Sequence, residues 1–263
     1  MSKNVVLTFD DGRKDQYTNA VRIMNKYHLK GTIFITTGFV ENRLDNGYFP
    51  SSGGESMSID DIRQCITQGH EIGSHSDMHI NVSEDIKKSL TKLREWTIDI
   101  LPPNYKFGFA SPSSDLYDKN ISTISDIISE LAYVRTSVQI RRNGIIYTLL
   151  FLINKILKSN YLFWKLNSRY IQTNLDGLVQ SVPVRSDTPI HNIKYLLETF
   201  PEDSTCVLLF HGVLSQEEKS KMKDCWYYPS DKFEEICALL KNEKYNVITL
   251  RDAMRREGVN NAV

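Results

Sequence analysis

Two adjacent carboxylates, Asp10 and Asp11, directly follow the apolar run Asn4–Phe9 and precede a turn glycine, Gly12. In parallel barrels, catalytic side chains are commonly carried at strand ends. Successive residues leaving a strand point in different directions, so one carboxylate can face a metal ion while its neighbour faces a water or another charge. Because ordinary polar turns also contain such residues, the motif gains meaning only with partners elsewhere in the chain.

Three histidines supply possible partners. His75 and His79 lie four residues apart after the strand-like residues Glu71–Gly73, and a helical turn there would let both rings converge on one metal ion. With a strand-end carboxylate they make three protein ligands, which leaves coordination positions for water and substrate. His211 ends the apolar run Val207–Phe210 and would share the same rim, although a histidine there can also be a cap or simply exposed.

Strand-like runs alternate with segments of helical spacing, which favours parallel strands joined by helical crossovers. Strands are expected at Asn4–Phe9, Gly31–Thr36, His70–Gly73, Lys106–Ala110, Ala132–Thr136, Leu178–Val184, Thr205–Phe210 and Tyr245–Leu250. Helices are expected at Gln16–Tyr27, Ser58–Gln68, Val82–Ile100, Ile121–Leu131, Pro189–Phe200 and Ser230–Lys241.

No repeat of fixed period and no linker-like composition divides the chain, so residues 1–263 are expected to form one domain. Residues 37–57 are predicted to be a long loop, which either borders a functional site or is an ordinary surface excursion. An apolar segment near 144–165 is interrupted by Asn154, Lys155 and Lys158, which makes it too polar to span a membrane. We expect a helical insertion there that packs on the protein, pairs subunits or contacts a membrane peripherally.

Composition limits the possible partners. The 32 basic and 32 acidic residues give a net charge near zero, which offers no broad attraction to nucleic acid or anionic membranes. The four cysteines form no CxxC pair and are expected to be reduced, structural thiols. The first four residues lead directly into an apolar run without an export signal, which predicts a cytoplasmic protein.

Taken together, these motifs resemble the polysaccharide deacetylase family, also known as the NodB-homology group or carbohydrate esterase family 4. TFDDG at Thr8–Gly12, HSxxH at His75–His79 and LxH at Leu209–His211 occur in the family's order. The resemblance implies an α/β fold, a distorted (β/α) barrel of seven to eight parallel strands. It also implies that Asp11, His75 and His79 bind one divalent metal ion. Zinc suits these ligands best, and cobalt, nickel, manganese or iron would also fit.

The same resemblance assigns proton transfer to two residues. It implies that Asp10 is the general base and His211 the general acid of an amide hydrolysis. In such a reaction the metal polarises the acetyl carbonyl, and a histidine can protonate the leaving amine near neutral pH.

Two family features are altered in this sequence. The third motif reads Phe109-Ala110-Ser111-Pro112-Ser113, with alanine where the family has an arginine and serine where it has a tyrosine. Pro112 is kept, and the backbone N–H of Ser113 could still stabilise the oxyanion. A charge partner for Asp10 must then come from elsewhere, with Arg135 and Arg185 as candidates. Asp187 is a candidate for the acidic residue of the fourth motif, which is otherwise not evident.

The sequence therefore predicts a metal-dependent hydrolase that removes an N-acetyl group from an amino sugar. A small, soluble or lipid-linked glycan precursor is favoured over a cell-wall polymer, because the altered motifs affect the substrate groove and the absence of an export signal points away from the wall. Two alternatives stay open. One is hydrolysis of another amide, such as a cyclic imide or ureide, and the other is a catalytically weakened carbohydrate-binding pseudoenzyme.

Overall fold

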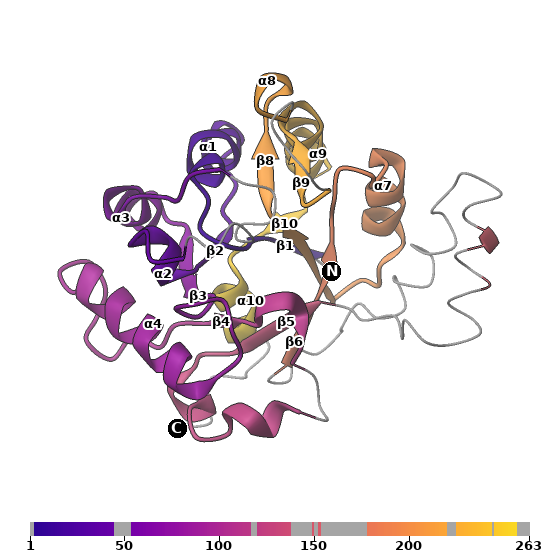
Figure 1. Cartoon of the computed structure of the whole chain (residues 1–263). Coiled ribbons are helices and arrows are strands. Elements are labelled where there is room, and N and C mark those ends of the chain that lie inside the picture. Colours follow the sequence, from indigo (N-terminus) through magenta and orange to yellow (C-terminus); the bar gives the residue numbers. More distant parts are fainter. Residues whose placement is uncertain are drawn as a thin grey trace.

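Seven parallel strands close into a barrel in the computed structural model (Figure 1). The structure describes residues 3–44, 54–116, 120–137, 149, 152–153, 178–219, 225–243 and 245–256. The barrel strands follow in chain order: β1 (Asn4–Phe9), β2 (Thr32–Ile35), β3 (Glu71–Ser74), β4 (Phe109–Ala110), β5 (Val134–Ser137), β6 (Leu178–Pro183) and β7 (Thr205–Phe210). β7 pairs back with β1 over six residue pairs, and β10 (Asn246–Val247) pairs with the start of β1. The predicted distorted (β/α) barrel is thereby confirmed.

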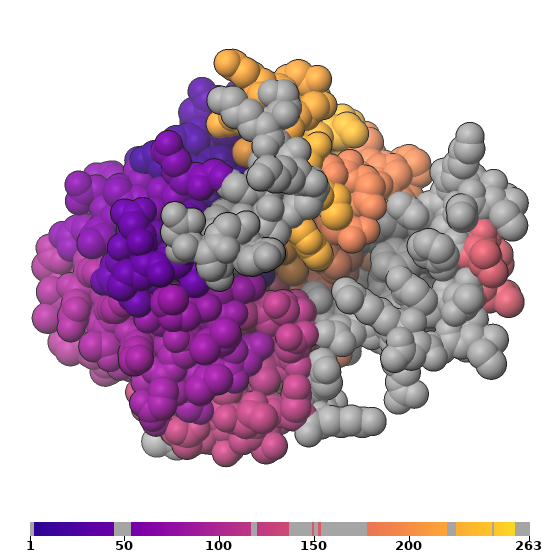
Figure 2. All heavy atoms as spheres, in the orientation of Figure 1, coloured from indigo at the N-terminus to yellow at the C-terminus, as the bar shows by residue number. Residues whose placement is uncertain are grey.

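Helices surround the barrel (Figure 1). In the space-filling view, segments that follow one another in the sequence lie next to one another around the molecule (Figure 2). They are α1 (Arg22–Lys26), α2 (Thr37–Val40), α3 (Ile59–Thr67), α4 (Ser83–Trp96), α7 (Ile190–Thr199), α8 (Gln216–Lys219), α9 (Ser230–Asn242) and α10 (Leu250–Arg256). A π-helical segment, η1 (Gln16–Val21), leads into α1, and a short pair of parallel strands, β8 (Gly212–Leu214) and β9 (Tyr227–Pro229), follows β7. Helix α3 begins where the sequence predicts, because Ser58 and Asp61 form a capping box.

Side chains alternate between two apolar layers along each strand. Val5, Leu7 and Phe9 of β1 join the large cluster beneath the surrounding helices. A second cluster holds one side chain from each of β1, β2, β4, β6 and β7, together with Tyr133 before β5, Ile248 after β10 and residues of α10. Its members are Val6, Phe34, Ala110, Tyr133, Val179, Val207, Ile248, Leu250, Ala253 and Met254. Because successive strand residues point to opposite faces, the residue that follows Phe9 points toward the barrel axis. This alternation aims Asp10 into the barrel.

A buried carboxylate fastens α10 to the barrel at the start of β3. Glu71 is 5% exposed and accepts hydrogen bonds from Tyr133 Oη at 2.7 Å, Thr32 Oγ1 at 2.8 Å and the backbone N–H of Arg251 at 2.9 Å. These partners come from β2, from α10 and from the residue before β5. Glu71 therefore closes the end of the barrel at which the strands begin, opposite to their carboxyl ends. That end is structural, and the opposite rim is free to carry chemistry.

Some predicted elements differ from the structure. The expected helix Ile121–Leu131 is two short 3-10 turns, Ile121–Ile124 and Ile128–Glu130. Its β-branched and serine residues have low helix propensity, and its fully buried residues, Ile124 and Ile127, are three apart, as a 3-10 turn allows. The expected strand Tyr245–Leu250 is only Asn246–Val247, because Leu250 already begins α10.

Two predicted segments are only partly described. The expected loop 37–57 opens with α2 and returns at Ser56, which forms an antiparallel bridge with Arg13; residues 45–53 lie outside the described part of the chain. The expected insertion near 144–165 also lies outside it, apart from Leu149, Leu152 and Ile153. Among the described residues no helix is long and apolar enough to cross a bilayer. The four cysteines are free, as expected.

Candidate active site

Side chains from three strand ends and one from within a fourth strand meet at one rim of the barrel. Asp10 and Asp11 follow β1, His75 follows β3, His211 follows β7, and Arg135 is the second residue of β5. Because the strands are parallel, their carboxyl ends all open at the same rim. The groups that the sequence singles out from distant segments are therefore neighbours.

Asp11, His75 and His79 form a cluster of possible metal ligands. One ligand atom from each lies within 4.8 Å of the other two, and Asp11 Oδ1 is 3.6 Å from His75 Nε2 and 3.8 Å from His79 Nε2. Metal–ligand bonds of about 2.0–2.1 Å at tetrahedral angles place ligand atoms roughly 3.3 Å apart, so a small inward movement would complete the site. His75 Nδ1 lies 2.8 Å from the carbonyl oxygen of Ala110. That carbonyl requires an N–H at Nδ1, which leaves the Nε2 lone pair facing Asp11. The residues present fit a divalent metal ion.

The segment between the two histidines is not the helical turn that their spacing would allow. Ser76 has φ of 66° and His79 has φ of 59°, so the chain passes twice through the left-handed region. Asp85, in the first turn of α4, accepts hydrogen bonds from the backbone N–H groups of Asp77 and Met78 at 2.9 and 2.8 Å. An irregular loop held by α4, and not helical spacing, brings the two rings together.

Arg135 is the charge partner of Asp10. Its side chain is fully buried, with Nη2 donating to Asp10 Oδ1 and Nη1 donating to Ser181 Oγ at 3.1 Å. Ala110, which stands where the family has its arginine, pairs in register with Arg135 on the adjacent strand. The structure thus shows the missing guanidinium one strand away, over the Phe34 ring at 5.0 Å.

The second carboxylate oxygen of Asp10 remains directed at the ligand cluster. Asp10 Oδ2 lies 3.9 Å from His75 Nε2. Burial alone would raise the pKa of Asp10, but the positive charge of Arg135, with smaller contributions from His75 and His211, holds this pKa below its usual value. Asp10 is therefore ionised at neutral pH and has one oxygen free to accept a proton.

Burial shifts the pKa of each possible metal ligand in the direction that favours the neutral form of its side chain. It raises the pKa of Asp11 to about 7, with repulsion from Asp10 adding to the effect. It lowers the pKa of His75 to about 4 and that of His79 to about 3. Both imidazoles are neutral at pH 7, as metal ligands must be, and Asp11 in the metal-free site binds its proton far more tightly than an exposed carboxylate does.

His211 follows β7 directly and packs against an indole ring. Its Nδ1 atom is buried and has no hydrogen-bond partner among the described residues. Burial lowers the pKa of His211 to about 4 although the charge of Asp10 opposes the shift. The ring centroids of His211 and Trp226 are 4.8 Å apart, and the N–H of Gly212 donates to the carbonyl oxygen of Trp226 at 3.2 Å.

Trp226 is a residue that the sequence reasoning missed. The only signal was the aromatic run Trp226-Tyr227-Tyr228, whose last two residues begin β9. The candidate roles of Arg185 and Asp187 are not supported by their positions. Arg185 stacks on Trp226 at 5.5 Å and pairs with Asp187 at 2.9 Å, and both side chains are exposed, at 40% and 54%. Within the described structure neither one contacts Asp10 or His211.

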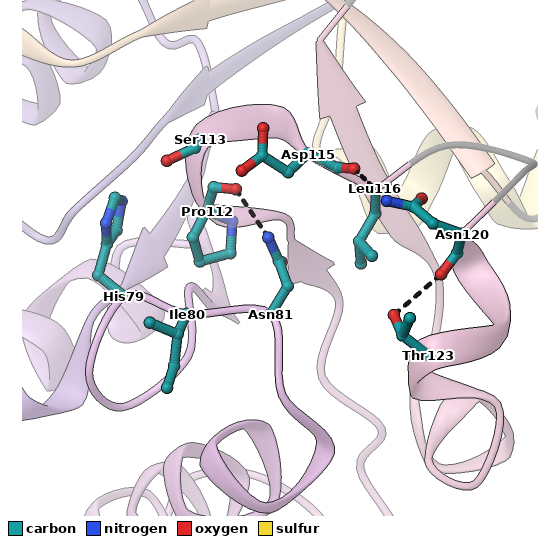
Figure 3. Close-up of a pocket in the computed structure, with 9 residues that line it drawn as sticks. All are labelled: His79, Ile80, Asn81, Pro112, Ser113, Asp115, Leu116, Asn120 and Thr123. Carbon is teal, nitrogen blue, oxygen red and sulfur yellow. Dashed lines mark hydrogen bonds between the residues drawn. The ribbon is translucent and has the colours of Figure 1, made fainter.

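A cavity of about 400 Å³ opens beside the ligand cluster (Figure 3). His79 stands at one end and Thr123 at the other, and Ser113 and Asp115 share one side (Figure 3). Asn81 Nδ2 donates to the carbonyl oxygen of Pro112 at 2.9 Å, which ties the wall of the cavity to the histidine loop. The lining residues are His79, Ile80, Asn81, Pro112, Ser113, Asp115, Leu116, Asn120 and Thr123. Pro112 and Ser113, the remnants of the third motif, therefore lie next to a possible metal ligand.

Comparison with known proteins agrees with these motifs. A family model described as polysaccharide deacetylase matches residues 1–127, which include Asp10, Asp11, His75 and His79. The resemblance inferred from the motifs is confirmed. No curated protein matches the sequence.

Solved structures share the fold. A carbohydrate esterase family 4 domain of a multidomain xylanase, from the hindgut metagenome of Trinervitermes trinervoides, is 15% identical, with a TM-score of 0.54, over 100% of this chain and 95% of its own. A family 4 acetyl xylan esterase from Clostridium thermocellum, in complex with cobalt, is 16% identical, with a TM-score of 0.51, over 97% and 92%. A family 4 pseudoenzyme from Bacillus anthracis is 14% identical, with a TM-score of 0.50, over 95% of this chain and 65% of its own. Since active and inactive proteins share this fold, activity has to be argued from the site.

Proposed function

We propose that this chain, which belongs over residues 1–127 to the polysaccharide deacetylase family, is a metal-dependent hydrolase that removes an N-acetyl group from an amino sugar. The observation that carries the proposal is that a complete set of possible metal ligands and a buried aspartate–arginine ion pair lie side by side at one rim of the barrel. Asp11, His75 and His79 can hold a metal ion, and the ionised Asp10 stands beside them with Arg135 on its other oxygen.

Asp11 Oδ1 and the Nε2 atoms of His75 and His79 would hold the metal ion. Bound there, a divalent ion supplies Lewis acidity toward the acetyl carbonyl and toward water. Zinc fits two imidazoles and a carboxylate best, and cobalt, nickel, manganese or iron would also fit. The neutral state of both imidazoles at pH 7 supports this role.

Asp10 takes the proton from the attacking water. Its Oδ1 is held by Arg135, so the proton goes to Oδ2, the oxygen that faces the ligand cluster. Arg135 keeps Asp10 ionised and orients it, which is what a base in a buried site needs. The backbone N–H of Ser113 is the proposed hydrogen-bond donor to the oxyanion.

His211 delivers a proton to the leaving amine. Its buried Nδ1 has no hydrogen-bond partner within the described residues, so no protein group there fixes which ring nitrogen carries the proton. Because burial lowers its pKa to about 4, His211 is neutral in the free protein, and the proton that it delivers to the amine is the one that Asp10 removed from the water, passed to His211 before the C–N bond breaks. Trp226 packs against the ring with the two ring planes at 51° and restricts its orientation.

The cavity beside His79 is the proposed site for the sugar. Its size falls within the range of about 300–1,000 Å³ that is typical of small-ligand sites. The side chains of Asn81, Ser113, Asp115 and Thr123 offer donors and acceptors to sugar hydroxyls, and Ile80 offers an apolar surface. A short amino sugar fits this lining, in line with a small soluble or lipid-linked precursor as the substrate.

The test combines metal loading with acetate release. Protein loaded with zinc or cobalt is incubated with N-acetylated monosaccharides, short oligosaccharides and nucleotide sugars, and acetate is assayed. Asp10→Asn should keep stoichiometric metal but lose turnover, whereas His75→Ala should lose both. Ring opening of a cyclic ureide without acetate release would replace the proposal by the other amide reaction. Sugar binding without turnover under any metal would identify a pseudoenzyme.

A further inference from the structure

Gln16 bridges the two residues that are proposed to transfer protons. It is the first residue of η1 and its side chain is fully buried. Its Nε2 donates to the backbone carbonyl oxygen of Asp10 and, at 3.1 Å, to that of His211. One side-chain amide therefore joins the ends of β1 and β7.

The orientation of this amide is fixed by a third contact. Gln16 Oε1 accepts a hydrogen bond from the backbone N–H of Arg13 at 3.3 Å. A primary amide has two N–H donors and one oxygen, so the arrangement uses both donors on carbonyls and the oxygen on an N–H. If the amide were rotated by half a turn, its oxygen would face two carbonyl oxygens, which is unfavourable in a buried site.

The bridge stands where the ladder between β1 and β7 ends. The register of the two strands runs to Phe9 and Phe210, and the N–H of Asp10 still donates to the carbonyl oxygen of Phe210 at 3.0 Å. Beyond that bond the two chains diverge, Asp10 toward the η1 turn and His211 toward β8. Gln16 supplies the next cross-strand connection, and the backbone of both residues is held from one point.

Building on the proposed function, we propose that Gln16 is a positioning residue that sets the distance between the base Asp10 and the acid His211. It acts through their backbone carbonyls and does not touch the substrate. Small displacements of reacting groups are costly, since a shift of about 1 Å can lower a rate by about a hundredfold. A buried amide with every hydrogen-bonding group used is well suited to prevent such a shift.

Asn19 provides a matched control on the same π-helical segment. Its Nδ2 donates to the carbonyl oxygen of Val213 at 2.8 Å and to Glu218 Oε2 at 2.9 Å. Asn19 therefore also ties η1 to the chain after β7, but it contacts neither Asp10 nor His211 through these bonds. Asn19→Leu should cost stability comparable to that of Gln16→Met without changing the site.

The experiment compares Gln16→Met and Asn19→Leu with the unsubstituted protein, each loaded with zinc. Gln16→Met keeps the side-chain length but removes both donors, and we expect kcat to fall by about tenfold to a hundredfold, with KM and metal stoichiometry unchanged. Asn19→Leu should stay within about twofold in kcat. Gln16→Asn keeps the amide but is one methylene too short to reach both carbonyls, so it should show the same fall in kcat. It replaces Gln16→Met in the comparison if the methionine variant does not fold.

A second readout does not depend on turnover. In the metal-free proteins the ring C–H signal of His211, assigned by its loss in His211→Gln, should move in Gln16→Met and Gln16→Asn and stay in place in Asn19→Leu. Equal kcat and an unmoved His211 signal in the Gln16 variants would overturn the inference. If the unsubstituted protein releases no acetate, the proposed function fails, and the His211 signal still decides whether Gln16 positions the site.

Discussion

Replacing Asp11 by asparagine should stabilise the metal-free protein while abolishing its metal site. Asp11 is 6% exposed, and its pKa is raised from 3.8 to about 7 by burial and by the charge of Asp10. A carboxyl group with a raised pKa favours folding in its protonated form, so its contribution is complete below pH 3.8 and is lost as pH rises through 7. Above that pH the folded protein carries an unfavourable buried charge.

The magnitude follows from the pKa difference. A difference of about three units corresponds to about 4 kcal/mol at pH 8, and to less than about 1 kcal/mol at pH 4. Asparagine removes the charge at nearly constant shape, and it tolerates the φ of 84° at this position better than most residues do. We expect Asp11→Asn to raise the unfolding free energy by up to about 4 kcal/mol at pH 8, with little gain at pH 4.

Urea denaturation of the metal-free proteins between pH 4 and pH 8 measures this effect. Asp10→Asn is the matched control, for which the unfolding free energy should change in the opposite direction. The pKa of Asp10 is lowered in the folded protein, and removal of its charge leaves the buried Arg135 without its partner. That control should be less stable at pH 8. If Asp11→Asn gave no gain at pH 8, or the same gain at every pH, the burial of an uncompensated carboxyl group at the metal site would be refuted.

Three further predictions concern the same rim. Arg135→Met should raise the pKa of Asp10, which moves the acidic limb of the kcat/KM profile to higher pH and lowers its plateau by about a hundredfold; an unmoved limb would rule out the charge-partner role. Zinc binding at pH 6 should release about one proton, because it displaces the proton of Asp11, as calorimetry in two buffers would measure; release of no proton at pH 6 would contradict the raised pKa of Asp11. Asp115→Asn should raise kcat/KM several-fold for a phosphorylated N-acetyl sugar relative to a neutral one, since a carboxylate lining the cavity repels phosphate; an unchanged ratio would place the sugar elsewhere.

The barrel could be predicted because its strands carry strong local signals. The run Thr205–Phe210 agrees with β7 residue for residue, and Ser58 with Asp61 marks the start of α3. The segment Ile121–Leu131 was misread, since its apolar residues suit a helix by spacing while its β-branched and serine residues weaken one. The period of apolar residues does not separate α-helical from 3-10 structure in so short a segment.

The site could be predicted only in part, for a different reason. Asp10, Asp11 and the histidines belong to contiguous motifs, so their types and spacing are visible in the sequence. The pairing of Arg135 with Asp10 depends on the register between β4 and β5, which places Arg135 beside Ala110. The contacts of Trp226 with His211 and of Gln16 with two carbonyls likewise arise from strand pairing and from η1. Of the two candidate arginines, Arg135 pairs with Asp10 in the structure, whereas Arg185 pairs with the exposed Asp187.

We propose that the protein is a deacetylase whose metal ion is held by Asp11, His75 and His79. The most direct measurement is metal content by elemental analysis, taken together with acetate release from a panel of N-acetylated sugars. We expect one divalent ion per chain, and acetate release that chelation abolishes and added metal restores. A protein that takes up no metal after reconstitution, or that releases acetate equally well with a chelator present, would contradict it.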